Sequence, residues 1–268
     1  MITSGISTAC LYPKLLENAL YELAIRNVDL VEIFFNTHSE LEKGFVNQLK
    51  SIIDSHGMKV SSIHPYTCGI EPMMFFTQYD RRYLDILDYY KKYFEVMNLL
   101  DAKIFVFHGN KLQNPVSDEL YFERYKGLYD LGKQYGITVA QENVSRCTSG
   151  DLDFLIRMSK ALGDSAKFVF DTKQAVRKGY NPYEFLDKIG DKIVHIHLSD
   201  HSEKGDCQLI GLGNLEFDKF VNKLIDISFT GSIILELYCS GYKHINDLSE
   251  NLFYFRDIIN YICDISQN

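Results

Sequence analysis

The sequence has no apolar stretch as long as the roughly 18 residues that cross a membrane, so a membrane-spanning or membrane-bound protein is not expected. Its first residues carry no basic cluster followed by an apolar core, and no signal peptide is expected. The six cysteines form no CxxC pair, which predicts reduced thiols and a cytoplasmic location. Acidic residues outnumber basic residues, and the resulting net charge of −8 argues against nucleic acid as the main partner.

What remains is an ordinary globular composition, with 46% hydrophobic and 24% charged residues. The length of 268 residues suits one large α/β domain or two small ones, and it is enough to bury a core without disulfides. No linker, composition break, internal repeat or low-complexity tract divides the chain. A single domain over residues 1–268 is therefore expected.

Short apolar runs alternate with segments of helical periodicity along the whole chain. The predicted strands are residues 2–7, 28–35, 59–64, 102–108, 137–143, 167–171, 193–198 and 232–237. The predicted helices are residues 13–26, 41–56, 81–100, 118–135, 151–162, 182–189, 218–227 and 248–262, with glycines at 57, 136 and 163 placed to end three of them. This alternation predicts a parallel sheet, and eight such units match an α/β fold of the (β/α)8 TIM-barrel type. A doubly wound open sheet is the alternative, but no GxGxxG follows the first strand.

Four of the predicted strands end in a carboxylate or an imidazole, namely Glu142 in ITVAQEN, Asp171 in KFVFDT, His197 in IVHIHLSD and Glu236 in GSIILELY. In a barrel, active residues lie at the C-terminal ends of strands, so these four side chains are expected to meet at one mouth. Three carboxylates there repel one another unless they are protonated or neutralised by a cation. The set predicts one divalent metal ion but does not select well among Mn²⁺, Mg²⁺, Co²⁺ and Zn²⁺, of which Mn²⁺ is our expectation.

Further polar residues lie at or just after the same strand ends. His64 and His108 each end a strand and could line the mouth or bond a neighbouring loop, whereas His195 lies one layer deeper and is expected to be structural. Arg146 and Lys173 follow the predicted ligands by four and two residues. Either could bind an anionic or polyhydroxyl substrate, or simply be solvated. Taken singly, residues of this kind are more often helix caps, ion-pair partners or core groups, and only the joint placement points to a site.

Five motifs occur in an order that is familiar from a known group of proteins. They are ENVSR at Glu142, FDT at Asp171, HIHLSD at His197, GLGNLEF at Gly211 and LELY at Glu236. Together they resemble the xylose-isomerase-like TIM-barrel superfamily, which contains sugar and sugar-phosphate isomerases, ketose 3-epimerases, hydroxypyruvate isomerases, inosose dehydratases and endonuclease IV. The resemblance spans essentially the whole chain.

The resemblance implies a function for the four strand-end residues. In the isomerase and epimerase members, residues matching Glu142, Asp171, His197 and Glu236 hold one divalent metal, and the two glutamates are the catalytic acid–base pair. The chain is thus expected to be a metal-dependent sugar or sugar-phosphate isomerase or epimerase that moves protons through a cis-enediolate. His64, His108, Arg146 and Lys173 are the candidate contacts to this small-molecule substrate. Many relatives pair through barrel helices, so a homo-oligomer is one expectation.

The sequence also departs from its relatives at three positions. Gln174 and Cys207 stand where endonuclease IV members have zinc-binding histidines, which argues against a trinuclear phosphodiesterase. Ketose 3-epimerases usually have a substrate-contacting His at the position of Gln174 and a Glu at that of Thr148, so a different substrate is expected. A lyase or dehydratase acting on a polyol or cyclitol, and a non-catalytic sugar-binding accessory barrel, are the alternatives that remain open.

Overall fold

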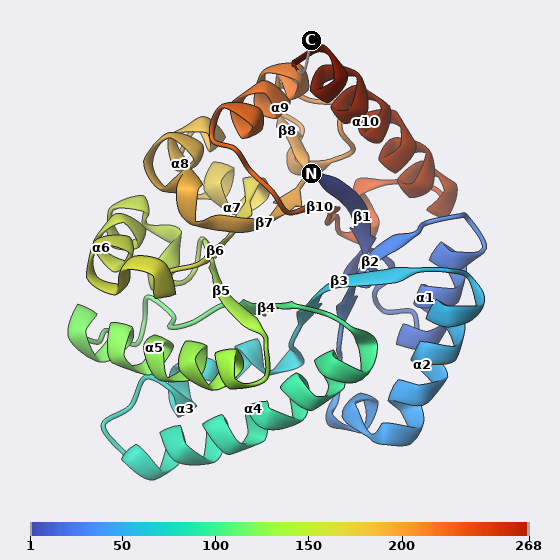
Figure 1. Cartoon of the computed structure of the whole chain (residues 1–268). Helices are drawn as coiled ribbons and strands as arrows, with labels where there is room; N and C mark the ends of the chain where they lie inside the picture. Colours follow the sequence, from blue (N-terminus) through green and yellow to red (C-terminus); the bar gives the residue numbers. More distant parts are fainter. Residues whose placement is uncertain (1, 267–268) are drawn as a thin grey trace.

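Eight parallel strands close into a barrel in the computed structural model, which describes residues 2–266 (Figure 1). The barrel strands are β1 (Thr3–Ser7), β2 (Leu30–Phe34), β3 (Lys59–His64), β4 (Ile104–Phe107), β5 (Thr138–Glu142), β6 (Phe168–Asp171), β7 (Ile193–Leu198) and β10 (Ser232–Leu235). Each pairs with its neighbour in chain order, and β10 closes the ring against β1. The prediction of a single-domain (β/α)8 barrel is confirmed. Residues 1, 267 and 268 of the expected domain lie outside the described part.

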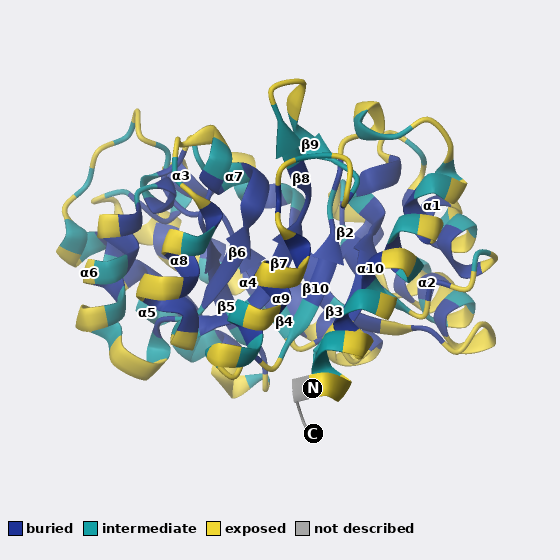
Figure 2. Cartoon of the chain, turned by 90° about the horizontal axis from the view of Figure 1, so that it is seen from above, coloured by how far each residue is buried: buried dark blue, intermediate teal, exposed yellow. Residues whose placement is uncertain are grey.

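An outer ring of helices surrounds the barrel in Figure 1. These helices are α1 (Leu16–Ala24), α2 (Lys43–Ser55), α4 (Asp80–Leu100), α5 (Asp118–Gln134), α6 (Leu152–Leu162), α8 (Pro182–Ile189), α9 (Phe217–Asp226) and α10 (Ile245–Ser266). Figure 2 shows buried strands at the centre and helices that turn exposed surfaces outward. The main apolar core therefore lies between the strands and this ring, where the outward-facing strand side chains meet the apolar stripes of the helices.

The connections contain shorter elements. They are the helices α3 (Glu71–Met74) and α7 (Thr172–Arg177), the antiparallel strands β8 (Asp200–Ser202) and β9 (Gly205–Gln208), and the 3-10 helices η1 (Thr8–Leu11), η2 (His38–Leu41), η3 (Tyr66–Gly69), η4 (Thr148–Gly150), η5 (Gly163–Ser165), η6 (Gly190–Lys192) and η7 (Cys239–Gly241). In Figure 2 the β8–β9 hairpin stands at one end of the barrel. The hairpin follows the C-terminal end of β7, so it marks the end at which strand-end side chains gather.

The predicted glycine stops lie where three helices end. Gly57, Gly136 and Gly163 all have positive φ, at 65°, 73° and 56°, and they follow α2, α5 and α6. Glycine adopts this left-handed conformation without the steric cost that a Cβ would bring. The sequence thus identified the ends of these helices from backbone chemistry alone.

Two local predictions were wrong. The first helix was expected to open at Pro13 but begins at Leu16, because Lys14 N–H bonds the carbonyl of Leu11 in a tight turn and the first helical bond runs from Ala19 to Leu15. The segment between the predicted strand 193–198 and the predicted helix 218–227 carries no predicted secondary structure, yet it contains the paired strands β8 and β9. In addition, α7 follows β6 directly and was not predicted; it is only six residues long, too short for a periodic signal.

The inside of the barrel has its own small apolar cluster, separate from the outer core. Val106, Ala140 and Val169 form it, all fully buried. Because side chains alternate along a strand, Glu142 lies on the same face as Ala140, and Asp171 lies on the same face as Val169. The strand-end carboxylates therefore project from a closed apolar plug rather than from an open pore.

Gly5 lies where strands β1 and β2 approach each other closely. A Cβ at Gly5 would lie 2.3 Å from the backbone oxygen of Leu30, whereas a Cβ at the exposed helical Gly44 would meet nothing within 4 Å. We expect Gly5→Ala to destabilise the protein by about 1–3 kcal/mol through overpacking. Gly44→Ala should instead stabilise it by up to about 1 kcal/mol, because glycine is a poor helix former. Chemical denaturation of both variants measures the difference, and equal stabilities would contradict this account of the barrel contact.

Candidate active site

Four side chains from the second half of the chain converge at the C-terminal mouth of the barrel. Glu142 ends β5, Asp171 ends β6, His197 lies on β7 and Glu236 directly follows β10. Each offers one ligand atom, and these four atoms all lie within 4.8 Å of one another. Glu142, Asp171 and His197 are buried, and the side chain of Glu236 is 13% exposed. The structure thus brings together all four residues that the sequence analysis grouped, and we call them the ligand cage.

His197 is the centre of the ligand cage. Its Nδ1 lies 3.0 Å from Oε1 of Glu142 and 3.5 Å from Oε2 of Glu236. Asp171 uses Oδ1 to accept the backbone N–H of Gln174 at 3.0 Å, which caps α7 and fixes the carboxylate. The other Asp171 oxygen, Oδ2, is the atom left for a further partner.

Two carboxylate oxygens of the cage are buried and have no hydrogen-bond partner among the described residues, Glu142 Oε2 and Asp171 Oδ2. Their nearest cations are His108 Nε2, 2.7 Å from Glu142 Oε2, and Lys173 Nζ, 3.2 Å from Asp171 Oδ2. Burial, together with the charges of Glu142 and Glu236, raises the pKa of Asp171 to about 6. Orphaned oxygens, mutual repulsion and a three-oxygen, one-nitrogen donor set together fit a divalent cation.

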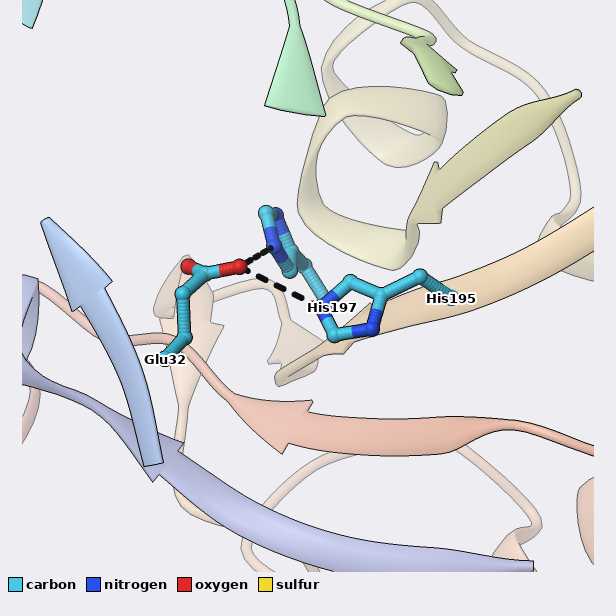
Figure 3. A group of neighbouring side chains, drawn as sticks. All are labelled: Glu32, His195 and His197. Atoms are coloured by element: carbon cyan, nitrogen blue, oxygen red, sulfur yellow. Dashed lines mark hydrogen bonds and ion pairs between the residues drawn. The ribbon is translucent and has the colours of Figure 1, made fainter. Parts of the chain in front are cut away.

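Glu32 of β2 is a site residue that the sequence analysis missed. It is fully buried, and its Oε2 lies 2.9 Å from His197 Nε2 and 3.2 Å from His195 Nε2 (Figure 3). The hydroxyls of Ser62 and Ser7 donate to its two oxygens at 2.8 and 3.1 Å. The available signal was a carboxylate in the middle of the apolar run LVEIFF, a placement that requires buried partners.

The contacts of Glu32 define the orientation of the His197 ring. Glu32 holds Nε2, so Nδ1 is the atom that faces Glu142 and the cage. Burial alone would lower the pKa of His197, but the charges of Glu32 and Glu236 raise it well above its ordinary value. A carboxylate behind a histidine fixes the tautomer that a metal ligand requires. His195 lies one layer below the cage, as expected, and helps to anchor Glu32.

His64 and His108 meet beside Glu142. Their Nε2 atoms are 2.8 Å apart, and His64 Nδ1 is 3.2 Å from the carbonyl oxygen of Pro65. Burial and the neighbouring His108 lower the pKa of His64 to about 4. Burial would also lower that of His108, but the Glu142 carboxylate raises the pKa of His108 well above its ordinary value. The pair therefore consists of a neutral His64 and a charged His108 whose proton lies next to Glu142.

Lys173 and Arg146 occupy different environments. Lys173 is only 3% exposed, and its Nζ lies 2.8 Å from Glu236 Oε2. The alternative that Lys173 is a solvated side chain is therefore wrong, because the side chain is part of the cage wall. Arg146 is exposed and lines the rim of the cavity above it.

A cavity of about 530 Å³ opens over the ligand cage. Its polar lining includes Glu142, Glu236, Lys173, His64, His108 and Arg146. Its apolar wall consists of Ala9, Tyr12, Phe34, Tyr66, Leu237 and Tyr238. This volume lies within the range of small-molecule sites, and carboxylates, imidazoles and cations at the base of an aromatic cup suit a small polar molecule.

Two motif residues that departed from the family pattern have structural contacts. Gln174 Oε1 accepts from the backbone N–H of Ser145 at 3.0 Å and from its hydroxyl at 2.7 Å, which ties the segment after β5 to α7. Cys207 lies on β9, and its Sγ accepts the N–H of Tyr238 at 3.4 Å. Gln174 also lines the cavity, where it presents an amide to the wall.

Asp200 explains the motifs that flank the β8–β9 hairpin. Its carboxylate accepts four backbone N–H groups, those of His201, Gly211, Gly213 and Leu215, at 2.7–3.0 Å. A Cβ at Gly213 would lie 2.4 Å from Asp200 Oδ1, so only glycine fits there. Asp200 thus closes the loop that carries the hairpin and holds it at the mouth of the site.

The fold and the cage together define a class of protein: a closed α/β barrel with a cluster of candidate metal ligands, three carboxylates and a histidine, at the C-terminal end of its strands. Residues 21–258 match the model of the xylose isomerase-like TIM barrel family, and the chain belongs to that family. Within residues 2–266, none of the helices combines the length and the apolarity needed to cross a bilayer.

Known proteins resemble the chain over nearly its full length. A protein of Methanocaldococcus jannaschii named uncharacterized protein MJ1311 is 26% identical over 251 residues, which cover 87% of this chain and 82% of that protein. The structure of a D-tagatose 3-epimerase-like protein superposes with a TM-score of 0.81 at 20% identity, covering 98% and 99% of the two chains. The 3-keto-D-glucoside 4-epimerase YcjR from E. coli gives 0.76 at 15% identity, with 96% and 100% covered. At these identities the structural likeness supports the fold.

The double contact of His197 predicts its protonation state. In the metal-free protein at neutral pH we expect both ring nitrogens to carry protons, because each faces a carboxylate. Glu32→Gln removes one of these charges, so the pKa of His197 should fall in the variant. Nitrogen-15 NMR of the histidine side chains over a pH titration measures this directly.

Glu40→Gln is a suitable control, since Glu40 is also buried but accepts the backbone N–H of Asn36 instead. It should leave the His197 titration unchanged. A neutral His197 in the metal-free wild-type protein at neutral pH would contradict this description of the cage.

Proposed function

We propose that this protein is a divalent-metal-dependent isomerase or epimerase of a small sugar or sugar phosphate. The observation that carries the proposal is the pair Glu142 and Glu236. Glu142 ends β5 and Glu236 follows β10, and β6 and β7 lie between these two strands in the barrel. Their carboxylates nevertheless lie close together and line the same cavity. Two carboxylates that flank a substrate carbon are what removal of a proton and its return from another direction require.

Glu142, Asp171, His197 and Glu236 would hold the metal ion. Glu142 Oε2 and Asp171 Oδ2, which lack hydrogen bonds in the described structure, support this assignment. A bound divalent ion supplies Lewis acidity, which makes a proton next to a carbonyl group more acidic. The related D-psicose 3-epimerase from Clostridium cellulolyticum H10 shares the fold with a TM-score of 0.75 at 13% identity, and its solved complex contains D-tagatose.

The environments of the two glutamates suit them to different roles. Burial opposes ionisation of Glu236, but the charges of Lys173 and His197 lower its pKa, so it is ready to accept a proton at neutral pH. Glu142 lies 2.7 Å from the charged His108, and this pair holds a proton that can be passed back to the substrate. Glu236 would thus be the base and the Glu142–His108 pair the acid in one direction, with the roles exchanged in the other.

The cavity favours a small polyhydroxyl molecule. Its base presents Glu142, Glu236 and Lys173, and its rim presents Arg146. The exposed guanidinium of Arg146 suits a phosphate or another oxygen-rich end of the substrate. A lyase reaction on a polyol shares the first proton removal and differs in the group expelled afterwards, so product analysis separates the two.

Proton exchange tests the catalytic assignment. The protein, loaded with Mn²⁺, is incubated in deuterated water with a panel of ketoses and ketose phosphates. A substrate should gain deuterium at the reacting carbon. Glu142→Gln and Glu236→Gln should each slow this exchange by about 10²–10⁴-fold, the usual contribution of general acid–base catalysis.

Glu203→Gln is the matched control, because Glu203 is exposed in the turn of the β8–β9 hairpin and should leave exchange unchanged. Loss of water without an isomerised product would replace the isomerase with a lyase. Exchange at the wild-type rate in both glutamate variants would reject the proposed chemistry, whereas sugar binding without turnover would indicate an accessory barrel.

Metal titration tests the cage independently of any substrate. Calorimetry of the dialysed protein should show one Mn²⁺ bound per chain. Asp171→Asn should abolish this binding, and Glu32→Gln should weaken it about 10–100-fold, because Glu32 orients a ligand without being one. Asp151→Asn, which alters the cap of α6 and the contact with the Tyr180 hydroxyl but none of the cage contacts, should bind like the wild type. Unchanged affinity in both site variants would place the metal elsewhere.

A further inference from the structure

Lys173 is a cation built into the wall of the ligand cage. Its Nζ lies 2.8 Å from Glu236 Oε2 and 3.2 Å from Asp171 Oδ2, and the side chain is 3% exposed. It makes no ion pair with Glu142, the carboxylate on the far side of the cage, within the described structure. The ammonium group therefore sits off-centre, against the Asp171–Glu236 edge.

Lys173 thus pairs with two of the four predicted ligands, Asp171 and Glu236. Glu142 instead contacts the imidazolium of His108 and Nδ1 of His197, and Glu236 lies 3.5 Å from the same Nδ1. An ion placed among the four ligand atoms would lie a few ångströms from the ammonium, in a buried setting where screening by water is weak. The metal and Lys173 therefore compete for the same negative charge.

The ammonium group of Lys173 also has an aromatic neighbour besides the two carboxylates. The ring of Tyr238 lies 5.1 Å from Lys173 Nζ, is partly exposed and lines the cavity. The guanidinium of Arg177 lies 5.1 Å from the same ring. An aromatic face attracts a cation, so the lysine can turn from the carboxylates to Tyr238 without becoming fully unpaired.

We propose that Lys173 is the resident counter-cation of the ligand cage, which neutralises Asp171 and Glu236 in the metal-free protein and which a divalent ion must displace. Lys173 then sets the metal affinity of the site and keeps the metal-free protein folded. This inference rests on the proposed metal site and assigns Lys173 a function beyond contact with substrate.

Lys173→Met tests the inference, because methionine keeps much of the side-chain volume and removes the charge. The metal-free variant is titrated with Mn²⁺, and free Mn²⁺ is followed by its electron paramagnetic resonance signal. We expect binding about tenfold tighter, or more, than in the wild type, since the competing charge is gone. Thermal unfolding should show the opposite effect without metal: the metal-free variant melts several degrees lower, and saturating Mn²⁺ restores it.

Three further variants keep the test decisive. Lys173→Gln should behave like Lys173→Met, and Lys173→Arg, which retains the charge, should bind Mn²⁺ as the wild type does. Lys178→Met removes an exposed lysine just after α7 and should change neither affinity nor melting. If the wild type binds Mn²⁺ and the two neutral variants bind it no more tightly, this inference alone is wrong. If none of the proteins binds Mn²⁺, the proposed metal-dependent function fails with it.

Discussion

The excess of negative charge inside the mouth of the barrel is the constraint on which the site depends. Glu32, Glu142, Asp171 and Glu236 place four carboxyl groups in a region that is largely closed to water. Buried charges are costly unless they are paired and hydrogen-bonded. The buried carboxylates at this end of the molecule are paired in this way. Serine hydroxyls and histidines contact Glu32, two imidazoles contact Glu142, and the ammonium group of Lys173 contacts Glu236.

The side chains inside the barrel form three successive layers, and the buried carboxylates lie in the upper two. Alternation along the strands stacks an apolar plug, then a polar layer around Glu32, then the cage at the strand ends. Asp200 and Gln174 then fix the loops above by accepting backbone N–H groups, so the rim is held by the main chain itself. The charged residues consequently stand between strand ends and hydrogen-bonded loops, and they face the cavity.

The barrel and the grouping of the four cage residues could both be predicted from one sequence feature, namely apolar runs of strand length that end in a polar residue. The run itself predicts a strand, and the polar residue at its end predicts a side chain at the mouth of the barrel. It revealed less where a residue acts across the barrel. Glu32 was overlooked because it lies in the middle of its strand and its partners come from three other strands, a relation that spacing along the chain does not contain. The burial of Lys173 was equally hidden, since only the fold shows that Glu236, 63 residues away, covers it. The start of α1 and the β8–β9 hairpin depended on local turn geometry for which the composition gave no signal.

The position of β10 in the chain has a consequence for synthesis of the protein. This strand pairs with both β7 and β1, so the ring is sealed only when it docks, and Glu236 follows it by a single residue. A nascent chain still lacking this segment presents Glu142, Asp171 and His197 without their fourth companion and without a sealed ring. Neither barrel closure nor completion of the ligand set can therefore precede synthesis of β10, and seven of the eight barrel strands come before it in the chain.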